Sequence, residues 1–367
     1  MPLLGAELAS PPFSARGMHV AAVRAGSMAD EAGLAAGDVV VGIGGLPVRS
    51  ARELRRAWQA IGAEPRVAIE SERGLHEATV QRRPSELVAG ATVEYGQIDR
   101  DVSLRTIVTR PAARAPAVLF LQGIGPSSLD FVGGAPPVAR LLHGLAGEGL
   151  VTMRLERRGV GDSEGELPDF DTEVADAQAA LAWLGARPFV QGVVLLGHSL
   201  GGMVAPLLEG ASARVVYGTT ARPWLSTLEE GTRRQLLLRG ASASEIEAAW
   251  AEERRALDED EIVHERSRAF HQQLAATDLA SAWRRGAART LVLAGEHDWV
   301  VDRDEQAEVA ALAGGELHTL PGYDHAFTHH DSLAASLEAY GKGGWDPRIV
   351  HEIAGFVREV TGARSVG

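Results

Sequence analysis

A serine between glycines carries the clearest chemical signal in this sequence. Ser199 lies in the stretch Gly197-His198-Ser199-Leu200-Gly201-Gly202, directly after the apolar run 193–196. Small residues at positions 197 and 201 are needed where a buried strand turns sharply and continues as a helix. Such a turn exposes the serine hydroxyl and directs the first N–H groups of the helix to the same point. The pattern predicts a nucleophile beside an oxyanion stabiliser; the alternative is a glycine-rich turn with an incidental serine.

Composition limits the classes of protein to consider. The 367 residues, 45% of them hydrophobic, can bury the core of one large and one small domain. The formal net charge of -13 disfavours a nucleic-acid partner. Because the chain has no cysteine, disulfides, a thiolate zinc site and a cysteine nucleophile are excluded. No apolar run is long enough to span a membrane and no signal sequence is evident, so we expect a cytoplasmic location.

The first 84 residues combine short strand-like runs with two helices. Ser27 is placed to cap a short helix that ends at Gly33. A second helix is predicted over residues 50–61, and alternating residues at 66–70 and 78–81 predict two further strands. This pattern indicates a small, β-rich domain.

Three short motifs in this segment are typical of one kind of module. They are Ala32-Gly33-Leu34, Gly37-Asp38-Val39 and Leu46-Pro47-Val48. On these motifs, residues 1–84 resemble a bacterial PDZ domain. The resemblance implies that Leu4, Gly5 and Ala6 belong to a carboxylate-binding loop, and that the C-terminal peptide of a partner adds as a strand beside it. The alternative is a groove that is empty or packed against the next domain.

Beyond a polar linker at 82–86, short apolar runs alternate with helical patterns. An antiparallel pair is predicted at 91–95 and 102–108. Six further strands are predicted at 117–121, 151–155, 193–196, 214–217, 290–294 and 317–320. Alternation of strands and helices predicts an α/β fold, with a mostly parallel eight-stranded sheet covered by helices on both faces. In such sheets ligands bind beyond the carboxyl ends of the strands.

Polar residues with complementary chemistry follow three of these strands. Ser199, Asp298 and His325 each come after a separate strand, in the order that an α/β-hydrolase triad requires. The glycine-rich loop 158–163 and the glycines before Asp298 and His325 add further matches. On these motifs, residues 88–362 resemble the serine α/β-hydrolase family, and residues 85–367 are predicted to form that domain.

The residue types and the resemblance together assign roles. Ser199 is the predicted nucleophile, and His325 is the base that takes its proton. Asp298 orients the imidazole and stabilises its cation. The resemblance implies that the N–H groups of Leu200 and Ile124 receive the oxyanion.

Other predicted substrate contacts come from the loop after the third strand and from an inserted segment. Many family members have His-Gly where this chain has Gln122-Gly123, so the loop is expected to be braced differently. Residues from about 220 to 288 have helical apolar spacing and are predicted to form a helical cap. Trp224 and Trp250 in this segment line an acyl pocket in one interpretation and belong to the core in the other.

Several other polar residues lie near the predicted triad. The competing histidines and acids are His297, His329, His330, Glu296, Asp302 and Asp304. A metal site at His329 and His330 is disfavoured because adjacent helical residues point in different directions, which predicts a solvated surface. Among the acids, only Asp298 has the family spacing after Gly295. Asp162 and Asp171 are expected to fix a loop and cap a helix, and His198 to be a packing residue.

These observations predict a serine hydrolase that cleaves an ester or thioester through an acyl-enzyme, with no metal or organic cofactor. An acyltransferase or a peptidase would use the same residues. A different class of function also stays open, in which the chain is a PDZ adaptor with an idle hydrolase scaffold.

Overall fold

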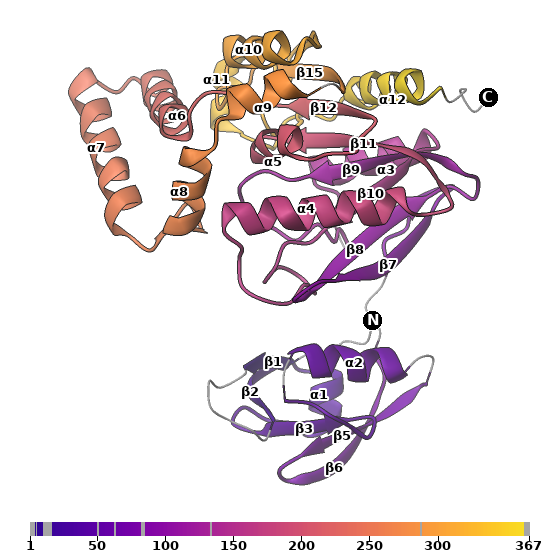
Figure 1. The fold of residues 1–367 in the computed structure, drawn as a ribbon. Helices are drawn as coiled ribbons and strands as arrows, with labels where there is room; N and C mark the ends of the chain where they lie inside the picture. Colours follow the sequence, from indigo (N-terminus) through magenta and orange to yellow (C-terminus); the bar gives the residue numbers. More distant parts are fainter. Residues whose placement is uncertain are drawn as a thin grey trace. The chain divides into compact units, whose positions relative to one another are not determined.

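The computed structural model describes residues 4, 6–9, 17–49, 51–61, 64–81, 85–132, 134–286 and 288–362. The chain divides into two compact units, Met1–Ser85 and Glu86–Gly367 (Figure 1). Each unit has a hydrophobic core of its own. The predicted domain boundary after residue 84 stays a prediction, because residues 82–84 lie outside the described ranges.

The first unit is built on an antiparallel sheet with strand order β1-β2-β3-β5-β6, in which β4 also pairs with β3. Its elements are β1 (Ala6–Ala9), β2 (Met18–Val23), α1 (Met28–Glu31), β3 (Val39–Ile43), β4 (Leu46–Pro47), α2 (Ala51–Ile61), β5 (Arg66–Ser71) and β6 (Gly74–Thr79). Met28, Ile43 and Ile69 are fully buried in its core.

Two expectations for the first unit have different outcomes. The Ser27 cap is confirmed, since its hydroxyl accepts a hydrogen bond from the N–H of Asp30. The last strand, expected at 78–81, lies instead at Gly74–Thr79. The expectation was wrong because the chain reverses directly after Ser71, which pairs with Gly74 and brings the hairpin partner forward.

The residues expected to form a carboxylate-binding loop are only partly described. Leu4 is buried, and its carbonyl accepts a hydrogen bond from the N–H of Ala29 at 2.9 Å. Ala6 begins β1, the strand at one end of the described sheet. Gly5 lies outside the described residues, so the role of this loop stays a prediction.

The second unit contains the predicted eight-stranded, mostly parallel sheet. The strand order is β16-β15-β12-β11-β9-β10-β8-β7, and all neighbours are parallel except β10 with β8 and β8 with β7. The strands are β7 (Thr92–Asp99), β8 (Ser103–Arg110), β9 (Ala115–Leu121), β10 (Val151–Leu155), β11 (Val190–His198), β12 (Ala213–Tyr217), β15 (Arg289–Gly295) and β16 (Glu316–Leu320). The expected fold class is confirmed.

Helices cover both faces of this sheet. They include α3 (Pro137–Gly147), α4 (Phe170–Gly185), α5 (Leu200–Val204), the short 3-10 helix η1 (Ala205–Leu207), α10 (Arg303–Ala313), α11 (Leu333–Glu338) and α12 (Arg348–Thr361). Alternate residues of β9 enter two cores: Leu119 packs with α4 and α5, and Phe120 packs with α3 and α12. Helix α4 begins after Asp169, whose carboxylate caps the N–H of Thr172 at 2.9 Å. The expectation that Asp171 caps this helix was therefore wrong by two residues.

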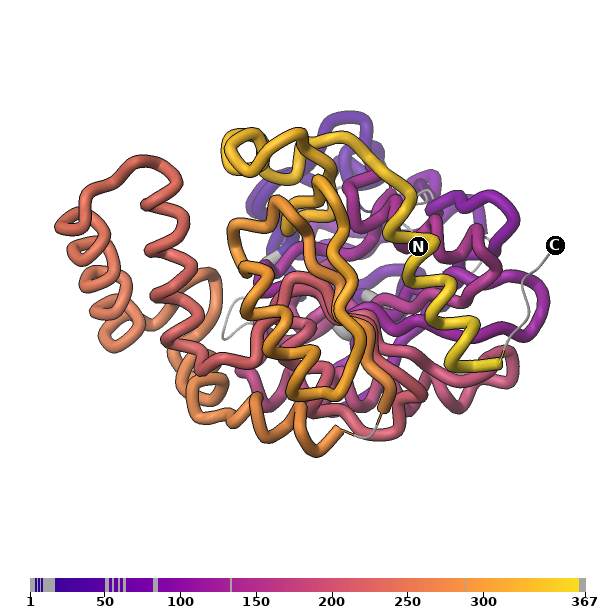
Figure 2. The backbone as a smooth tube through the Cα atoms, turned by 90° about the horizontal axis from the view of Figure 1, so that it is seen from above, coloured from indigo at the N-terminus to yellow at the C-terminus, as the bar shows by residue number. Residues whose placement is uncertain are grey.

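A helical segment separates β12 from β15. It contains α6 (Trp224–Leu238), α7 (Ala243–Glu259), the hairpin β13 (Ile262–Val263) and β14 (Arg266–Ser267), α8 (Arg268–Ala276) and α9 (Leu279–Arg285). Figure 2 shows α6 and α7 as a pair that projects away from the sheet. This segment coincides with the region where a cap is predicted. Among the described residues, no helix combines the length and apolar character needed to cross a membrane.

A buried ion pair ties the start of the second unit to its sheet. Arg154 of β10 donates two hydrogen bonds to Glu86, at 2.9 and 3.0 Å, and a third to the carbonyl of Leu129 at 2.7 Å. Glu86 also accepts the N–H of Phe131 at 2.7 Å. Burial opposes ionisation of Glu86, but hydrogen bonds from His143, Arg154 and Phe131 outweigh it and lower the pKa of Glu86 to about 2. This pair therefore fixes the loop 129–131.

We predict that Glu86→Gln lowers the free energy of unfolding by about 3 kcal/mol at pH 7, because it leaves the buried Arg154 without a counter-charge. The native pKa of about 2 lies below the ordinary value of 4.5, so the stabilisation is complete above pH 4.5 and is lost as the pH falls towards 2. Urea unfolding followed by tryptophan fluorescence at several pH values measures this.

The matched control is Glu94→Gln, which removes the partner of Arg110 from a pair that is more exposed. We expect that variant to lose less than about 1 kcal/mol. Equal losses for the two variants, or a loss for Glu86→Gln that does not change between pH 5 and 2, would contradict the assignment.

Candidate active site

Ser199 sits at a strained reversal of the chain between β11 and α5. Its backbone angles are φ 54° and ψ −119°, a conformation that residues with a side chain rarely adopt. A Cβ atom at Gly201 would overlap the carbonyl oxygen of Leu121, and one at Gly197 would lie 2.6 Å from the carbonyl oxygen of Gly201. The predicted strand-turn-helix geometry and its need for glycine are confirmed.

Asp298 and His325 form a buried pair beyond the ends of β15 and β16. The distance between Asp298 Oδ2 and His325 Nδ1 is 2.9 Å. The other oxygen of Asp298 accepts the N–H groups of Val300 and Val301 at 2.9 and 3.0 Å. A Cβ atom at Gly218, after β12, would lie 2.7 Å from His325 Nδ1. Three strand ends thus meet at this pair.

His198 connects the serine turn with His325, and Gly123 lies against the same turn. His198 Nε2 lies 2.9 Å from the carbonyl oxygen of His325, and the two imidazole rings are 4.9 Å apart. Burial, and to a smaller extent the charge of His325, lower the pKa of His198 to about 3. His198 is therefore neutral near pH 7 and donates Nε2–H to that carbonyl. A Cβ atom at Gly123 would lie 3.4 Å from the Cβ of Ser199, so the loop after β9 lies against Ser199.

A second buried acid, Asp324, fixes the loop that carries His325, and sequence reasoning missed it. Its carboxylate accepts the N–H groups of Ala326 (3.0 Å) and Thr328 (2.7 Å), and it also lies 3.1 Å from His330 Nε2. The expectation of a solvated surface at His330 was wrong, because this stretch is not helical and the imidazole is buried against Asp324. Spacing along the chain gave no signal for this contact.

The loop after β9 is braced by Arg157, which the sequence analysis did not single out. Its guanidinium donates to the carbonyls of Gln122 (3.2 Å), Gly123 (2.5 Å) and Gly125 (2.7 Å), and it reaches that of Ile124 at 3.5 Å. The side-chain amide of Gln122 is oriented so that its oxygen accepts a hydrogen bond from Arg157 at 3.1 Å and its nitrogen donates to the carbonyl of Ser127 at 3.2 Å. Only the position of Arg157 beside the glycine-rich loop 158–163 could have drawn attention to it.

A pocket of about 590 Å³ opens beside this loop. Its lining includes the predicted contacts Gln122 and Gly123, and also His198 and Ala326, which neighbour Ser199 and His325 in the sequence. Its other walls are mostly apolar and comprise Phe120, Leu129, Phe131, Val132, Pro136, Pro137, Val138 and Phe327, with Ser127, Ser128 and Asp130 among the polar exceptions.

The two predicted tryptophan contacts are not among the residues that line this pocket. Trp224 is buried, and its indole N–H lies 3.0 Å from Nδ1 of His271. Trp250 lies on α7 and is partly exposed. Their contribution to substrate binding stays a prediction.

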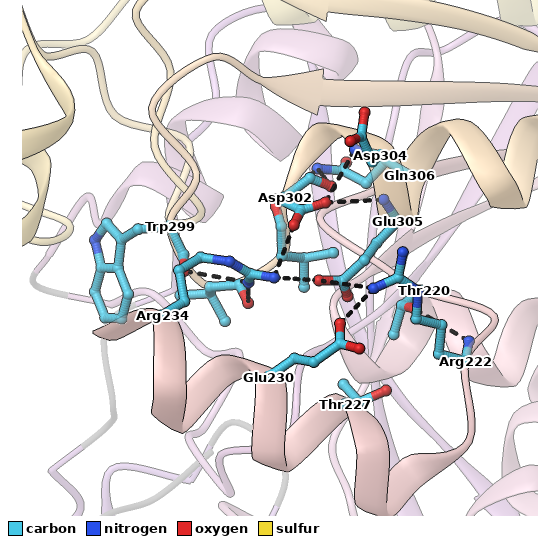
Figure 3. Close-up of polar contacts among 12 residues, drawn as sticks. Thr220, Arg222, Thr227, Glu230, Arg234, Trp299, Asp302, Asp304, Glu305 and Gln306 are labelled. Atoms are coloured by element: carbon cyan, nitrogen blue, oxygen red, sulfur yellow. Dashed lines mark hydrogen bonds and ion pairs between the residues drawn. The ribbon is translucent and has the colours of Figure 1, made fainter. Parts of the chain in front are cut away.

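Helix α6 is fastened to the loop that follows Asp298 (Figure 3). Arg234 donates to the carbonyls of Val300 at 2.6 Å and Trp299 at 3.4 Å, and to the carboxylate of Asp302 at 2.9 Å. It also contacts Glu305, whose pKa is raised by burial. The inserted helices therefore support the backbone that positions the acid of the pair. Within the described ranges, no group of three or more histidine and carboxylate side chains is arranged to bind a metal ion.

Comparison with known proteins assigns both units. The sequence profile of the alpha/beta hydrolase family matches residues 118–337, well over half of the chain. The chain belongs to the alpha/beta hydrolase family. A PDZ domain profile matches residues 19–73, so this hydrolase carries an N-terminal PDZ domain.

The sequence identity to individual relatives is low. The hydrolase is 28% identical over 251 residues to the esterase EstD of Thermotoga maritima, across 65% of this chain and 61% of that esterase. The solved structures that share its fold include an alpha/beta hydrolase and an esterase. The alpha/beta hydrolase GrgF of Penicillium sp. has a TM-score of 0.51 and 15% identity, covering 74% of this chain and 99% of that chain. An esterase of Pyrococcus furiosus has a TM-score of 0.50 and 14% identity, covering 77% and 98%.

We predict that Gly201→Ala lowers the free energy of unfolding by about 1–3 kcal/mol, because the added methyl group would overlap the backbone of β9. Urea unfolding measures the change. The control is Gly355→Ala, an exposed position on α12 where a Cβ atom meets nothing within 4 Å. That variant should be slightly more stable, by about 0.5–1 kcal/mol. An unchanged stability for Gly201→Ala would show that the turn can relax.

Proposed function

We propose that this hydrolase is an esterase that cleaves carboxylic esters through an acyl-enzyme on Ser199. One observation carries the proposal: Ser199 lies at a strained strand-to-helix turn, and the adjacent His198 contacts the carbonyl of His325, whose Nδ1 lies 2.9 Å from Asp298. Such an arrangement suits acyl transfer, because the hydroxyl is a weak nucleophile that needs an adjacent base.

The pair selects the tautomer of the base. The Asp298 carboxylate only accepts hydrogen bonds, so it selects the tautomer in which His325 carries its proton on Nδ1. Nε2 is then left with a lone pair. In the proposed mechanism, Nε2 takes the proton of Ser199 as the hydroxyl oxygen attacks the ester carbonyl, and Asp298 stabilises the imidazolium that results.

The remaining steps use the same groups. The N–H groups of Leu200 and Ile124 receive the negative charge on the carbonyl oxygen. Collapse of the tetrahedral intermediate breaks the bond to the alcohol oxygen, which takes the proton from His325. Water then attacks the acyl-enzyme with His325 again as the base, which releases the acid and restores Ser199.

The pocket beside Gln122 and Gly123 is proposed to receive an apolar group of the ester. Its walls are mostly apolar, and its volume of about 590 Å³ lies in the range of small-molecule sites. The segment from about 220 to 288 is proposed as the cap, with Trp224 and Trp250 as further candidate contacts.

The chemistry of the acyl donor and acceptor separates the alternatives. The Thermotoga relative is named an esterase, which favours ester hydrolysis over peptide cleavage and acyl transfer. Thioesters would react at the same residues. An adaptor with an idle hydrolase domain would lack a reactive Ser199.

The PDZ domain is proposed to bind the C-terminal peptide of a partner. Strand β1 lies at one end of the described sheet, where a peptide can add as a further strand beside Ala6. Leu4, two residues before this strand begins, is held by the hydrogen bond from the N–H of Ala29 to its carbonyl. We expect the protein to act in the cytoplasm, in line with its lack of cysteine.

We predict that Ser199→Ala abolishes hydrolysis of p-nitrophenyl butyrate and labelling by a fluorophosphonate, while the circular-dichroism spectrum is unchanged. Asp298→Asn should lower kcat by about 10⁴-fold, because the amide favours the wrong histidine tautomer. Asp304→Asn is the control, since this exposed acid on α10 should leave kcat unchanged. A wild-type protein that is not labelled would favour the adaptor, and full activity of Ser199→Ala would disprove the mechanism.

We also predict that Val132→Trp, which fills the proposed pocket, discriminates against bulky apolar esters. The value of kcat/KM for p-nitrophenyl phenylacetate should fall by about 10–100-fold relative to p-nitrophenyl acetate. Leu87→Trp, at a position that is 93% exposed, is the control. An equal change for both esters would remove this pocket from substrate recognition.

A further inference from the structure

The carbonyl groups of four consecutive residues turn towards one guanidinium. Arg157 lies within 3.5 Å of the carbonyl oxygens of residues 122–125, and its closest contact, at 2.5 Å, is with Gly123. In a planar trans peptide the C=O and the next N–H point in opposite directions. Because Gly123 C=O and Ile124 N–H belong to one peptide unit, the bond to Arg157 directs the N–H of Ile124 away from the guanidinium.

Arg157 is itself held by a largely buried carboxylate. Glu173 of α4 lies 2.7 Å from Nε and 2.7 Å from Nη2 of Arg157, so the guanidinium is fixed on two nitrogens. The side chain of Arg157 is 5% exposed. Burial lowers the pKa of Arg157 to about 9, which still leaves it charged at neutral pH. One positive charge thus lies behind the peptide groups of the loop.

The other oxygen of Glu173 is bound by an arginine from the proposed cap. Arg266 of β14 donates to Glu173 Oε2 and lies over the ring of Phe270, 4.1 Å from its centroid. Its side chain is fully buried, and two of its nitrogens, Nε and Nη1, have no hydrogen-bond partner among the described residues. Two arginines and one carboxylate leave a net charge of +1, which favours negative charge developing nearby.

We propose that Arg157 is the positioning residue of the oxyanion loop, residues 122–125, in this hydrolase. Glu173 couples the position of the β13–β14 hairpin of the cap to Arg157, because it binds both Arg157 and Arg266. Gln122 occupies the place where many family members have histidine, and Arg157 supplies the brace for this loop. The inference rests on the proposed esterase chemistry at Ser199, because the loop matters only if an oxyanion forms there.

The test compares Arg157→Gln and Arg157→Lys with the wild-type full-length protein. With p-nitrophenyl butyrate, Arg157→Gln should lower kcat about 10²–10³-fold, the effect of losing one oxyanion donor, while KM changes less than about threefold. Arg157→Lys keeps the charge but not the forked donors, so its kcat should fall between those of the wild type and Arg157→Gln. The inhibition constant of a trifluoromethyl ketone, which forms an oxyanion adduct with serine, should rise in proportion to the loss in kcat.

The matched control is Arg158→Gln. Arg158 is also buried, but it pairs with Asp101 and Asp176 instead of the loop carbonyls. That variant should lose thermal stability while its kcat, measured on folded protein, stays within about threefold of the wild type. Equal kcat losses in Arg157→Gln and Arg158→Gln, or a ketone affinity that does not change, would reduce Arg157 to a structural role and overturn the proposal.

The link to the cap is tested with Arg266→Gln, alone and combined with Arg157→Gln. The single variant should lower kcat about tenfold, and the double variant should be no slower than Arg157→Gln, because both act through one loop. The control is Arg268→Gln in the same segment. Arg268 donates to the backbone carbonyls of Glu259 and Asp260, so its substitution should leave kcat unchanged. Multiplicative losses would overturn the link. If the wild type itself neither hydrolyses the ester nor is labelled at Ser199, the proposed function fails instead.

Discussion

The contact between the start of α5 and the end of β9 is the constraint on which the site depends. Gly201 lies so close to the carbonyl of Leu121 that no side chain fits between them. This approach lets the chain reverse within one residue, and it forces Ser199 into a backbone conformation that costs roughly 1–3 kcal/mol. The same contact places the residues after Leu121 beside the serine. The serine turn and the loop after β9 therefore pack directly against each other, and neither can move without the other.

Buried carboxylates at the sheet edge convert this packing into defined side-chain geometry. Asp298 accepts two backbone N–H groups with one oxygen and faces His325 with the other. Asp324 does the same for the loop that carries the histidine. Each acid accepts hydrogen bonds from the neighbouring backbone with one carboxylate oxygen. These bonds fix the orientation of the carboxylate that contacts the imidazole. Fixed acceptors of this kind stabilise a charge without rearrangement during the reaction.

Two arginines play a corresponding part for backbone carbonyls. Arg154 joins Glu86 to the pocket loop at Leu129, and Arg157 joins Glu173 to the loop at 122–125. Buried ion pairs contribute little net stability compared with apolar packing, because both charges must leave water. A guanidinium nevertheless does what an apolar side chain cannot, since its five N–H groups satisfy several carbonyls that turn inward at once. Both pairs are better explained by the loop conformations that they specify than by the stability that they add.

The sequence by itself determined the alternation of strands and helices in the second unit, the serine turn and the placement of Ser199, Asp298 and His325 after separate strands. These features depend on local periodicity and on glycines that neighbouring backbone requires. Tertiary structure decided which polar residues support the site. Arg157 contacts residues more than 30 positions earlier in the chain, and Asp324 binds His330 in a stretch that is not helical, so no repeat along the chain marks either contact. The observed cap of α4 is Asp169 instead of Asp171, and β6 begins at Gly74 instead of Ala78. In both cases several nearby residues suit the role, and tertiary packing selects one of them. Local patterns specify where chemistry can occur; the contacts that orient it form only when distant segments are packed together.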